Sequence, residues 1–233
     1  MAGNDRIRRQ RRKARRPAGQ GRVKPVKARD ASSRQWLERQ WNDPYVAAAA
    51  RDGYRARSAY KLIEIDDRHR ILPVGGRVLD LGAAPGSWCQ VARQRVGPEG
   101  VVVGLDLLES EPLPGATLVV GDVHDPETAA PLREALGGPA DAVLSDMAPN
   151  TTGHKPTDRL RVEAVAEAAL DLGEEVLAPG GSFLAKMLHA GGSNAVTDRL
   201  KQRFRRVEHI KPPASRSESD EVYVLATGFG ETR

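Results

Sequence analysis

Along most of the chain, short apolar runs alternate with longer stretches in which apolar residues recur at helical spacing. Short apolar runs predict strands, and a spacing of three or four residues predicts helices. The expected strands are 77–81, 101–105, 117–120, 141–145, 181–185, 205–209 and 222–226. The expected helices between them are 86–95, 127–136, 157–177 and 194–203. This alternation predicts an α/β fold with a mostly parallel, seven-stranded sheet and helices on both faces.

One further helix is expected before the first strand. Ser58 stands where a helix N-cap is expected, and apolar residues follow at helical spacing as far as Ile65. Pro73 and the two glycines that follow it end this stretch. Residues 150–157, rich in Thr, Gly, Pro and His, predict a loop after the fourth strand. Sheets of this kind bind ligands beyond the carboxyl ends of their strands, so this loop is expected to border a ligand site.

The first expected strand leads into a turn of small residues. An apolar run containing Asp80 is followed by G-A-A-P-G, which ends at Gly86, and then by a helix-like stretch. The next apolar run ends on an acidic residue, Asp106, twenty positions after Gly86. In a βαβ unit this arrangement places the turn beside a ligand and the carboxylate beside ribose hydroxyls. These features predict a site for a cofactor that contains a nucleoside.

The turn favours a cofactor without phosphates. No Gly-Lys-Ser/Thr follows it and no G-x-G-x-x-G is present, so neither a Walker loop nor a dinucleotide loop is indicated. Pro85 lacks a backbone N–H where a pyrophosphate needs donors. S-adenosylmethionine fits better, with ribose hydroxyls on Asp106 and the adenine amino group on Asp122. Two alternatives stay open: Asp122 also suits a turn cap, and Trp88 suits either the pocket wall or the core.

Composition limits the class of protein. The 233 residues, 39% of them apolar, suffice for one α/β domain with a sizeable core. No apolar run reaches the roughly 18 residues of a membrane span, and no apolar region of a signal peptide follows the N-terminus, so a cytoplasmic protein without a membrane partner is expected. The single cysteine, Cys89, fits a reducing compartment. The five histidines show no metal-ligand spacing, so no metal is expected.

Positive charge is concentrated at the N-terminus. Residues 1–30 contain twelve Lys or Arg and two Asp, whereas the other 203 residues carry a net charge of −5. Because residues 1–30 contain few apolar side chains, we expect a disordered basic arm there and a catalytic domain at 31–233. An Arg-rich arm favours contact with RNA through release of counterions. A solubilising tail and a transit peptide are the alternatives.

Four charged residues occupy positions where a strand or helix usually carries apolar ones. Lys61 lies on an otherwise apolar helical stretch, and Asp146 follows the fourth expected strand. Lys186 ends the fifth, and Glu221 opens the last. Neighbouring parallel strands end at the same edge of a sheet, so Asp146 and Lys186 are expected to meet there. Taken singly, each has a structural explanation: such a lysine extends to water, and such a carboxylate caps or pairs.

Five segments together resemble the FtsJ/RrmJ (RlmE) family of RNA ribose 2′-O-methyltransferases over about residues 32–230. They are S-A-Y-K-L (58–62), L-D-L-G-A-A-P-G-S-W (79–88), S-D-M-A-P-N (145–150), A-K-M (185–187) and S-R-S-E-S-D-E-V-Y (215–223). The resemblance implies a Rossmann-like class I S-adenosylmethionine-dependent methyltransferase. It implies a catalytic tetrad of Lys61, Asp146, Lys186 and Glu221. It also implies cofactor contacts at Gly86, Trp88, Asp106, Asp122 and Asp146. Ser87 stands where the family often has a second glycine, and a small side chain there is expected to be tolerated.

The residue types suit this reaction. A ribose 2′-hydroxyl that attacks a sulfonium methyl in line must be positioned and must lose one proton. Lys186 is the expected general base. Burial and the positive charge of Lys61 favour its neutral amine, whereas Asp146 favours the charged form. Lys61 is expected to hold a substrate phosphate or steer the 2′-oxygen, and Glu221 to position Lys61 or the ribose.

Other methylation reactions fit less well. Methylation at cytosine C5 needs a cysteine nucleophile, and Cys89 lies inside the first expected helix. Methylation of base amino groups favours Asp/Asn-Pro-Pro-aromatic after the fourth strand, where this chain has D-M-A-P-N. The resemblance to the FtsJ/RrmJ (RlmE) family implies methylation of the A-loop uridine of 23S rRNA in the 50S subunit, and a monomer is expected. The alternatives are a 2′-O-methyltransferase of tRNA or mitochondrial rRNA and an inactive ribosome-assembly factor that binds RNA.

Overall fold

The structure is a computed structural model that describes residues 43–149, 152–188 and 194–231. The basic arm expected at 1–30 lies outside the described residues, as does the beginning of the expected catalytic domain. The strands are β1 (Arg77–Leu81), β2 (Val101–Asp106), β3 (Thr117–Val120), β4 (Ala140–Ser145), β5 (Leu177–Leu188), β6 (Phe204–Ile210) and β7 (Glu221–Phe229). The helices are α3 (Pro44–Asp52), α4 (Ala59–His69), α5 (Ser87–Val96), the 3₁₀ turn η1 (Pro126–Thr128), α6 (Ala129–Leu136), α7 (Lys155–Val176) and α8 (Asn194–Arg203). No helix among the described residues is both long enough and apolar enough to cross a bilayer.

The strands form one sheet in the order β3-β2-β1-β4-β5-β7-β6. The pairs among β1 to β5 are parallel, whereas β7 runs antiparallel to both β5 and β6. This confirms the predicted mostly parallel, seven-stranded sheet. From β1 the chain builds outward to β2 and β3 and then returns to place β4 on the other side of β1. Such a reversal opens a crevice at the carboxyl ends of β1 and β4, where ligands bind in this fold class.

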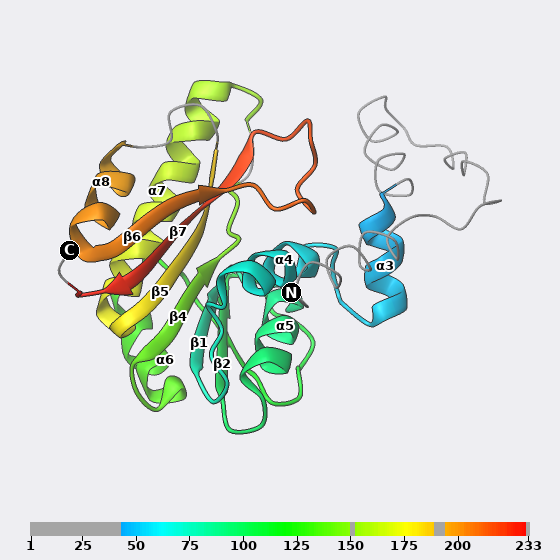
Figure 1. Ribbon diagram of the computed structural model, residues 1–233, viewed down its shortest axis with the longest axis vertical. Helices are drawn as coiled ribbons and strands as arrows, with labels where there is room; N and C mark the ends of the chain where they lie inside the picture. Colours follow the sequence, from blue (N-terminus) through cyan, green and yellow to red (C-terminus); the bar gives the residue numbers. More distant parts are fainter. Residues whose placement is uncertain (1–42, 150–151, 189–193, 232–233) are drawn as a thin grey trace.

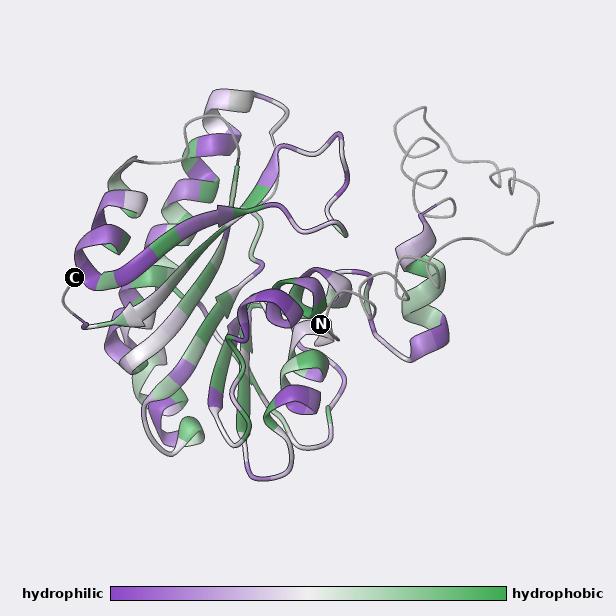
Figure 2. Cartoon of the chain, viewed as in Figure 1, coloured by the Kyte–Doolittle hydropathy of each residue, from purple (hydrophilic) through white to green (hydrophobic). Residues whose placement is uncertain are grey.

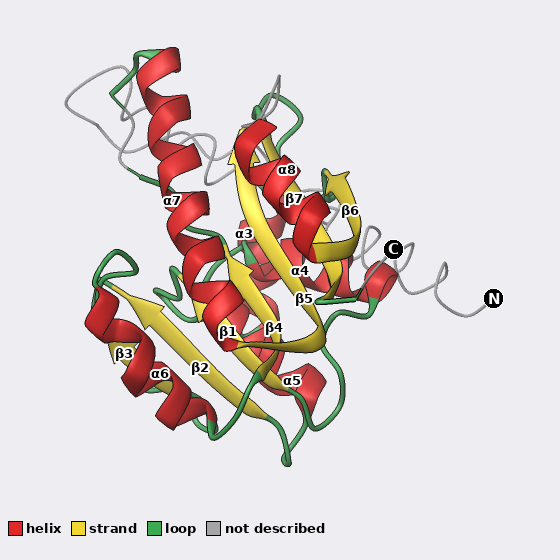
Figure 3. Cartoon of the chain, turned by 90° about the vertical axis from the view of Figure 1, so that its left-hand side faces the viewer, coloured by secondary structure: helices red, strands yellow, loops and turns green. Residues whose placement is uncertain are grey.

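Helices cover both faces of the sheet, as expected (Figures 1 and 3). One core cluster packs α6, α7 and α8 against the side chains of one face, including Leu79 and Phe183. The other packs α3, α4 and α5 against the opposite face, including Val78 and Leu144. The inner strands are predominantly apolar, and the polar residues lie mainly on helices and loops (Figure 2). Burial on both faces explains why the central strands read as continuous apolar runs rather than alternating ones.

Two expectations about the N-terminal helices need correction. Helix α3 was not anticipated, although Asp43 accepts a hydrogen bond from the Tyr45 amide and Pro44 fills the first helical position. Ser58 does not cap α4 with its side chain: its backbone is already helical (φ −61°, ψ −22°). Its hydroxyl instead lies 2.8 Å from the Ser87 hydroxyl, at the start of α5. The hydroxyl therefore joins α4 to the turn after β1 rather than serving its own helix.

The fifth strand is longer than expected. Strand β5 starts directly after α7 and continues to Leu188, so Lys186 lies inside it rather than at its end. The extension beyond residue 185 pairs with β7, which matches Lys186 with Tyr223 and Leu188 with Glu221. Directly opposed residues in an antiparallel pair share one face of the sheet. Lys186 and Tyr223 therefore lie on the same face, at the edge where β4 ends.

Candidate active site

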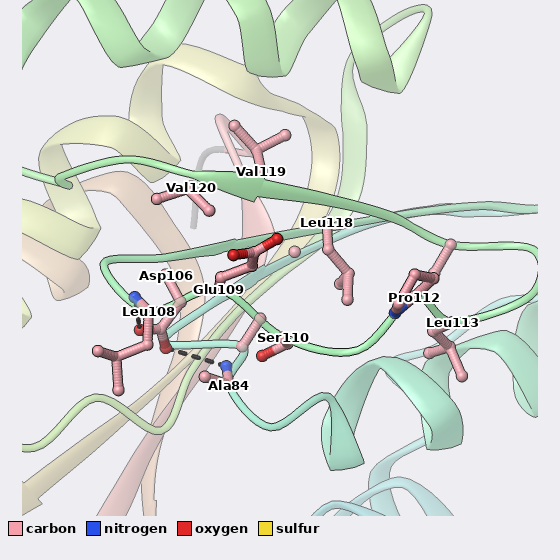
Figure 4. Close-up of a pocket in the computed structure, with 13 residues that line it drawn as sticks. Ala84, Asp106, Leu108, Glu109, Ser110, Pro112, Leu113, Leu118, Val119 and Val120 are labelled. Atoms are coloured by element: carbon pink, nitrogen blue, oxygen red, sulfur yellow. Dashed lines mark hydrogen bonds between the residues drawn. The ribbon is translucent and has the colours of Figure 1, made fainter.

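The carboxylate of Asp106 connects the turn after β1 to the loop after β2. Its Oδ2 accepts the backbone N–H of Ala84 at 2.9 Å, and its Oδ1 accepts that of Leu108 at 2.9 Å (Figure 4). Each carboxylate oxygen has more than one lone pair, so both can still accept from a ligand hydroxyl. Backbone donors thus orient a carboxylate that keeps acceptor capacity free.

A cavity of about 490 Å³ opens beside this carboxylate. Three of the predicted cofactor residues, Asp106, Asp122 and Asp146, line it together with Gly82, Leu107, Val123 and Met147. Asp122 Oδ1 also accepts the backbone N–H of His124 at 2.9 Å. Asp122 therefore stabilises a turn and lines the cavity at once, so the two interpretations of this residue are compatible.

The other two predicted cofactor residues do not line this cavity. The Trp88 side chain is 2% exposed, and its Nε1–H donates to the Ser58 carbonyl at 2.9 Å. Its ring lies 5.8 Å from that of Tyr223, so the indole belongs to the core between α5 and β7. Gly86 has φ +103° and lies against the Arg55 side chain. Cofactor contacts by Gly86 and Trp88 stay predictions.

The four residues predicted as a tetrad lie together at the carboxyl ends of β4 and β5. Lys61 Nζ is 2.7 Å from Glu221 Oε1 and 3.7 Å from Asp146 Oδ1. Lys186 Nζ donates to Asp146 twice, to Oδ1 at 2.8 Å and to the backbone carbonyl at 2.6 Å. All four side chains are largely buried, with exposed fractions of 8% to 17%. Two ammonium groups and two carboxylates therefore balance each other within one cluster.

Tyr223 lies at the centre of this cluster, and sequence reasoning missed it. Its hydroxyl accepts from Lys61 Nζ at 3.0 Å and donates to Asp146 Oδ1 at 2.6 Å. Burial raises the pKa of Tyr223 well above its usual value, and the charges of Asp146 and Glu221 add to this, so the phenol stays protonated. A signal existed in the sequence, because Glu221 and Tyr223 are two positions apart on a strand and so face the same side.

The two lysines keep Asp146 ionised despite its burial. Burial alone raises the pKa of this carboxyl, but the charges of Lys186 and Lys61 and the hydrogen bonds from Lys186 and Tyr223 bring it below its usual value. Buried carboxylates need such partners, because desolvation otherwise favours the neutral acid. Asp146 is thus a fixed anion that holds one amine on each side.

Comparison with known proteins agrees with this geometry. Residues 54–229 match the FtsJ-like methyltransferase family. The chain belongs to the FtsJ-like methyltransferase family. It is therefore a methyltransferase, and its cofactor is S-adenosyl-L-methionine.

Similar proteins carry a more specific name. "Ribosomal RNA large subunit methyltransferase E" of Gluconobacter oxydans is 52% identical over 211 residues, which covers 91% of this chain and 78% of that protein. The protein of the same name from Paramagnetospirillum magneticum is 53% identical over 223 residues, 91% of each chain. Among solved structures, a putative ribosomal RNA methyltransferase from Plasmodium falciparum superposes with a TM-score of 0.69 at 28% identity, covering 77% of this chain and 100% of that one.

One buried acidic residue of this FtsJ-like methyltransferase was not among the predicted site residues. Asp80, on β1 directly before the turn, is fully buried. Its Oδ2 accepts from the Cys89 thiol at 3.2 Å, while its Oδ1 has no hydrogen-bond partner among the described residues. Burial raises the pKa of Asp80 to about 7. Burial and the Asp80 charge raise the pKa of the Cys89 thiol, so Cys89 is a packing residue, as expected, and not a nucleophile.

Proposed function

We propose that this methyltransferase transfers a methyl group to a ribose 2′-hydroxyl of RNA, and that its target is the A-loop uridine of 23S rRNA in the 50S subunit. The observation that carries the reaction type is the pair of hydrogen bonds from Lys186 to Asp146 beside the 490 Å³ cavity. The printed names of relatives at 52–53% identity support large-subunit rRNA as the substrate.

The residues around the cavity fit S-adenosylmethionine. Asp106 offers free acceptor capacity for ribose hydroxyls, and Asp122 offers it for an adenine amino group. When bound, the cofactor supplies an electrophilic methyl group on a sulfonium.

Lys186 is the general base in this proposal. To act as a base, Lys186 must first release one proton from its ammonium form. The neutral amine then has two hydrogens and one lone pair, and the two hydrogen bonds to Asp146 occupy both hydrogens. The remaining tetrahedral position of Nζ holds the lone pair and accepts the proton of the 2′-hydroxyl as that oxygen is alkylated. Asp146 then stabilises the ammonium that forms. Orientation of the base and removal of the proton thus both depend on the contacts between Lys186 and Asp146.

In this proposal Lys61 stabilises negative charge on the substrate, and Glu221 holds Lys61 in position. Lys61 is held between Glu221 Oε1 and the Tyr223 hydroxyl, so its ammonium has a fixed direction. A fixed positive charge lowers the free energy of an alkoxide-like oxygen or a neighbouring phosphate. Glu221 holds Lys61 in place and is itself held by a hydrogen bond from Ser215.

The proposal extends to partners and location. We assign the arm at 1–30 to RNA contact, because its net charge is +10. The protein is proposed to act as a monomer in the cytoplasm, where bacterial ribosomal subunits are assembled. Removing the arm should weaken RNA binding and flatten its dependence on salt, and identical salt slopes with and without it would contradict this role.

The test is methyl transfer from labelled cofactor to 50S subunits, with the modified nucleotide mapped. Lys186→Ala should reduce transfer by about a thousandfold or more, because it removes the base, and should leave cofactor affinity unchanged. Lys201→Ala, at an exposed lysine on α8 that pairs with Asp198, is the matched control. Normal transfer by Lys186→Ala would remove Lys186 from the mechanism. A mark on tRNA, or no transfer by the unmodified protein, would overturn the substrate assignment.

A further inference from the structure

Arg55, in the linker between α3 and α4, holds two loops that are distant in sequence. Its Nη1 donates to the Pro85 carbonyl at 2.9 Å and to the Glu111 carbonyl at 2.7 Å. Its Nη2 donates to the Pro112 carbonyl at 2.8 Å. Its backbone N–H donates to Gln90 Oε1 on α5 at 2.8 Å. Within the described part of the chain, the guanidinium therefore bonds to backbone carbonyls and to no carboxylate.

The turn after β1 fits closely against this guanidinium. A Cβ added at Gly86 would lie 2.8 Å from Arg55 Nη1, and Gly86 has φ +103°, which disfavours other residues. The Arg55 side chain thus occupies the space that a side chain at position 86 would need. Glycine at this position is explained by the approach of Arg55, apart from any cofactor contact.

The loop held on the other side depends strongly on Arg55. Residues 109–113 belong to no helix or strand. Among the described residues, the hydrogen bonds that join 109–113 to a distant part of the chain both come from Arg55. Without them, the segment between Asp106 and β3 keeps only local bonds and packing. Asp106 connects the turn to the start of this loop at Leu108, and Arg55 provides the hydrogen bonds between the turn and the rest of the loop.

Both loops border the proposed cofactor site. Ala84 and Leu108 line the 490 Å³ cavity and also bind the Asp106 carboxylate. On the other side of these residues lies a second cavity of about 280 Å³, bordered by Ser110 and Pro112 (Figure 4). Leu113 packs against the core, but the space beside the rest of the loop is incompletely filled. The hydrogen bonds from Arg55 to the Glu111 and Pro112 carbonyls hold the loop in addition to this packing.

The same linker also contacts the next residues of the turn. The Ser58 carbonyl accepts from Trp88 Nε1, and the Ser58 hydroxyl contacts the Ser87 hydroxyl. Lys61 follows one turn later on α4. Residues 55–58 therefore connect the turn with the helix that carries a tetrad lysine, and Arg55 is the contact that reaches the far loop.

We propose that Arg55 is a positioning residue for the cofactor site. It holds the turn at 82–86 and the loop at 107–113 in the arrangement that binds S-adenosylmethionine, and it takes no part in methyl transfer itself. This inference rests on the proposed location of the cofactor in the cavity beside Asp106. It predicts that Arg55 governs cofactor affinity and leaves turnover at saturating cofactor unchanged.

The test compares Arg55→Ala and Arg55→Lys with Arg51→Ala, calorimetrically and in the methylation assay. Arg51, on α3, has the same charge and pairs with Asp52 of its own helix. Loss of charged hydrogen bonds should raise the dissociation constant of S-adenosylmethionine about 10- to 100-fold in Arg55→Ala, with kcat at saturating cofactor unchanged. Arg55→Lys should lie in between, since an ammonium cannot reproduce the fork. Arg51→Ala should bind normally.

Added methylguanidinium gives a readout that general destabilisation would not produce. It should restore part of the cofactor affinity of Arg55→Ala and have no effect on Arg51→Ala. Unchanged affinity in Arg55→Ala, or a fall in kcat at saturating cofactor, would overturn the inference. If Arg55→Ala does not fold, Arg55→Lys decides by the same criteria.

Asp106→Ala separates this inference from the proposed site. Weakened binding in Asp106→Ala beside normal binding in Arg55→Ala would refute Arg55 alone. Normal binding in both would refute the location of the cofactor.

Discussion

Two carboxylates at the carboxyl ends of strands β2 and β4 are held by different kinds of partner. Asp106, at the end of β2, is oriented by backbone N–H groups of Ala84 and Leu108. Asp146, directly after β4, is held by Lys186, Lys61 and the Tyr223 hydroxyl. Backbone donors carry no net charge and cannot titrate, so Asp106 is a static acceptor. The partners of Asp146 are charged or can exchange protons, so its surroundings can take part in a reaction.

In the proposed function, this difference separates the main contacts to the cofactor from the groups that take part in the chemistry. The β1–β3 half supplies a site made mainly of backbone and small residues, which suits recognition of a ligand that is not altered at its ribose or base. The half formed by β4, β5 and β7 supplies buried charges on rigid strands, where a strong local field is available to a reacting group. Substitutions in the two halves test whether the two carboxylates differ in this way.

Asp146→Ala should have the largest effect. It leaves Lys61 and Lys186 partly buried with one fewer anion, which typically costs about 3 to 5 kcal/mol of stability. It also removes the partner that orients the proposed base, so kcat should fall at least about a thousandfold. Urea unfolding and single-turnover transfer measure the two effects. A variant with normal stability would show that water or rearrangement compensates the lysines and that the cluster is not tightly coupled.

Asp80→Asn should change how stability depends on pH. In the unfolded chain this carboxyl titrates near pH 3.8, whereas in the folded protein its pKa is raised to about 7. The folded state therefore binds more protons between these values, and the unmodified protein should lose up to about 4 kcal/mol relative to Asp80→Asn as the pH rises from 4 to 7. Urea midpoints across this range measure the change. Parallel curves would mean that Asp80 is ionised in the folded protein throughout.

Asp106→Ala should weaken cofactor binding about 10- to 100-fold while stability falls by only about 1 kcal/mol. The reason is that its partners are backbone N–H groups at a partly open cavity, where water can replace the carboxylate. Calorimetric titration and thermal unfolding provide the two values. A stability loss as large as that of Asp146→Ala would remove the distinction between the two carboxylates.

The sequence predicted more of the binding half than of the catalytic half. All seven strands and the position of Asp106 follow from local patterns, because a strand, a small-residue turn and an acid lie within one βαβ unit. The adjacency of strands predicted that Asp146 and Lys186 meet, but only the family resemblance added Lys61, on α4, and Glu221, on β7, to them. Their distances depend on how β5 and β7 pair, which no local pattern encodes.

The residues that were missed or misplaced share this dependence on tertiary pairing. Strand alternation puts Tyr223 on the same side as Glu221, but only the pairing of β7 with β5 brings it next to Lys186. Ser58 reads as a helix cap until α5 brings Ser87 to it. Helix α3 is different, since Asp43 and Pro44 form a local start signal that could have been recognised.

Ser215→Ala should have the smallest effect and sharpens the comparison most. The Ser215 hydroxyl donates to Glu221 Oε1 at 2.9 Å, and the serine is only 8% exposed. Losing this neutral hydrogen bond should lower kcat about 3- to 10-fold, at roughly 1 kcal/mol, without changing cofactor affinity. Ser217→Ala, in the same loop but exposed and bonded to Glu218, is the matched control. Equal loss in both variants would assign the effect to loop stability, whereas a change in cofactor affinity would show that the catalytic half also contributes to binding.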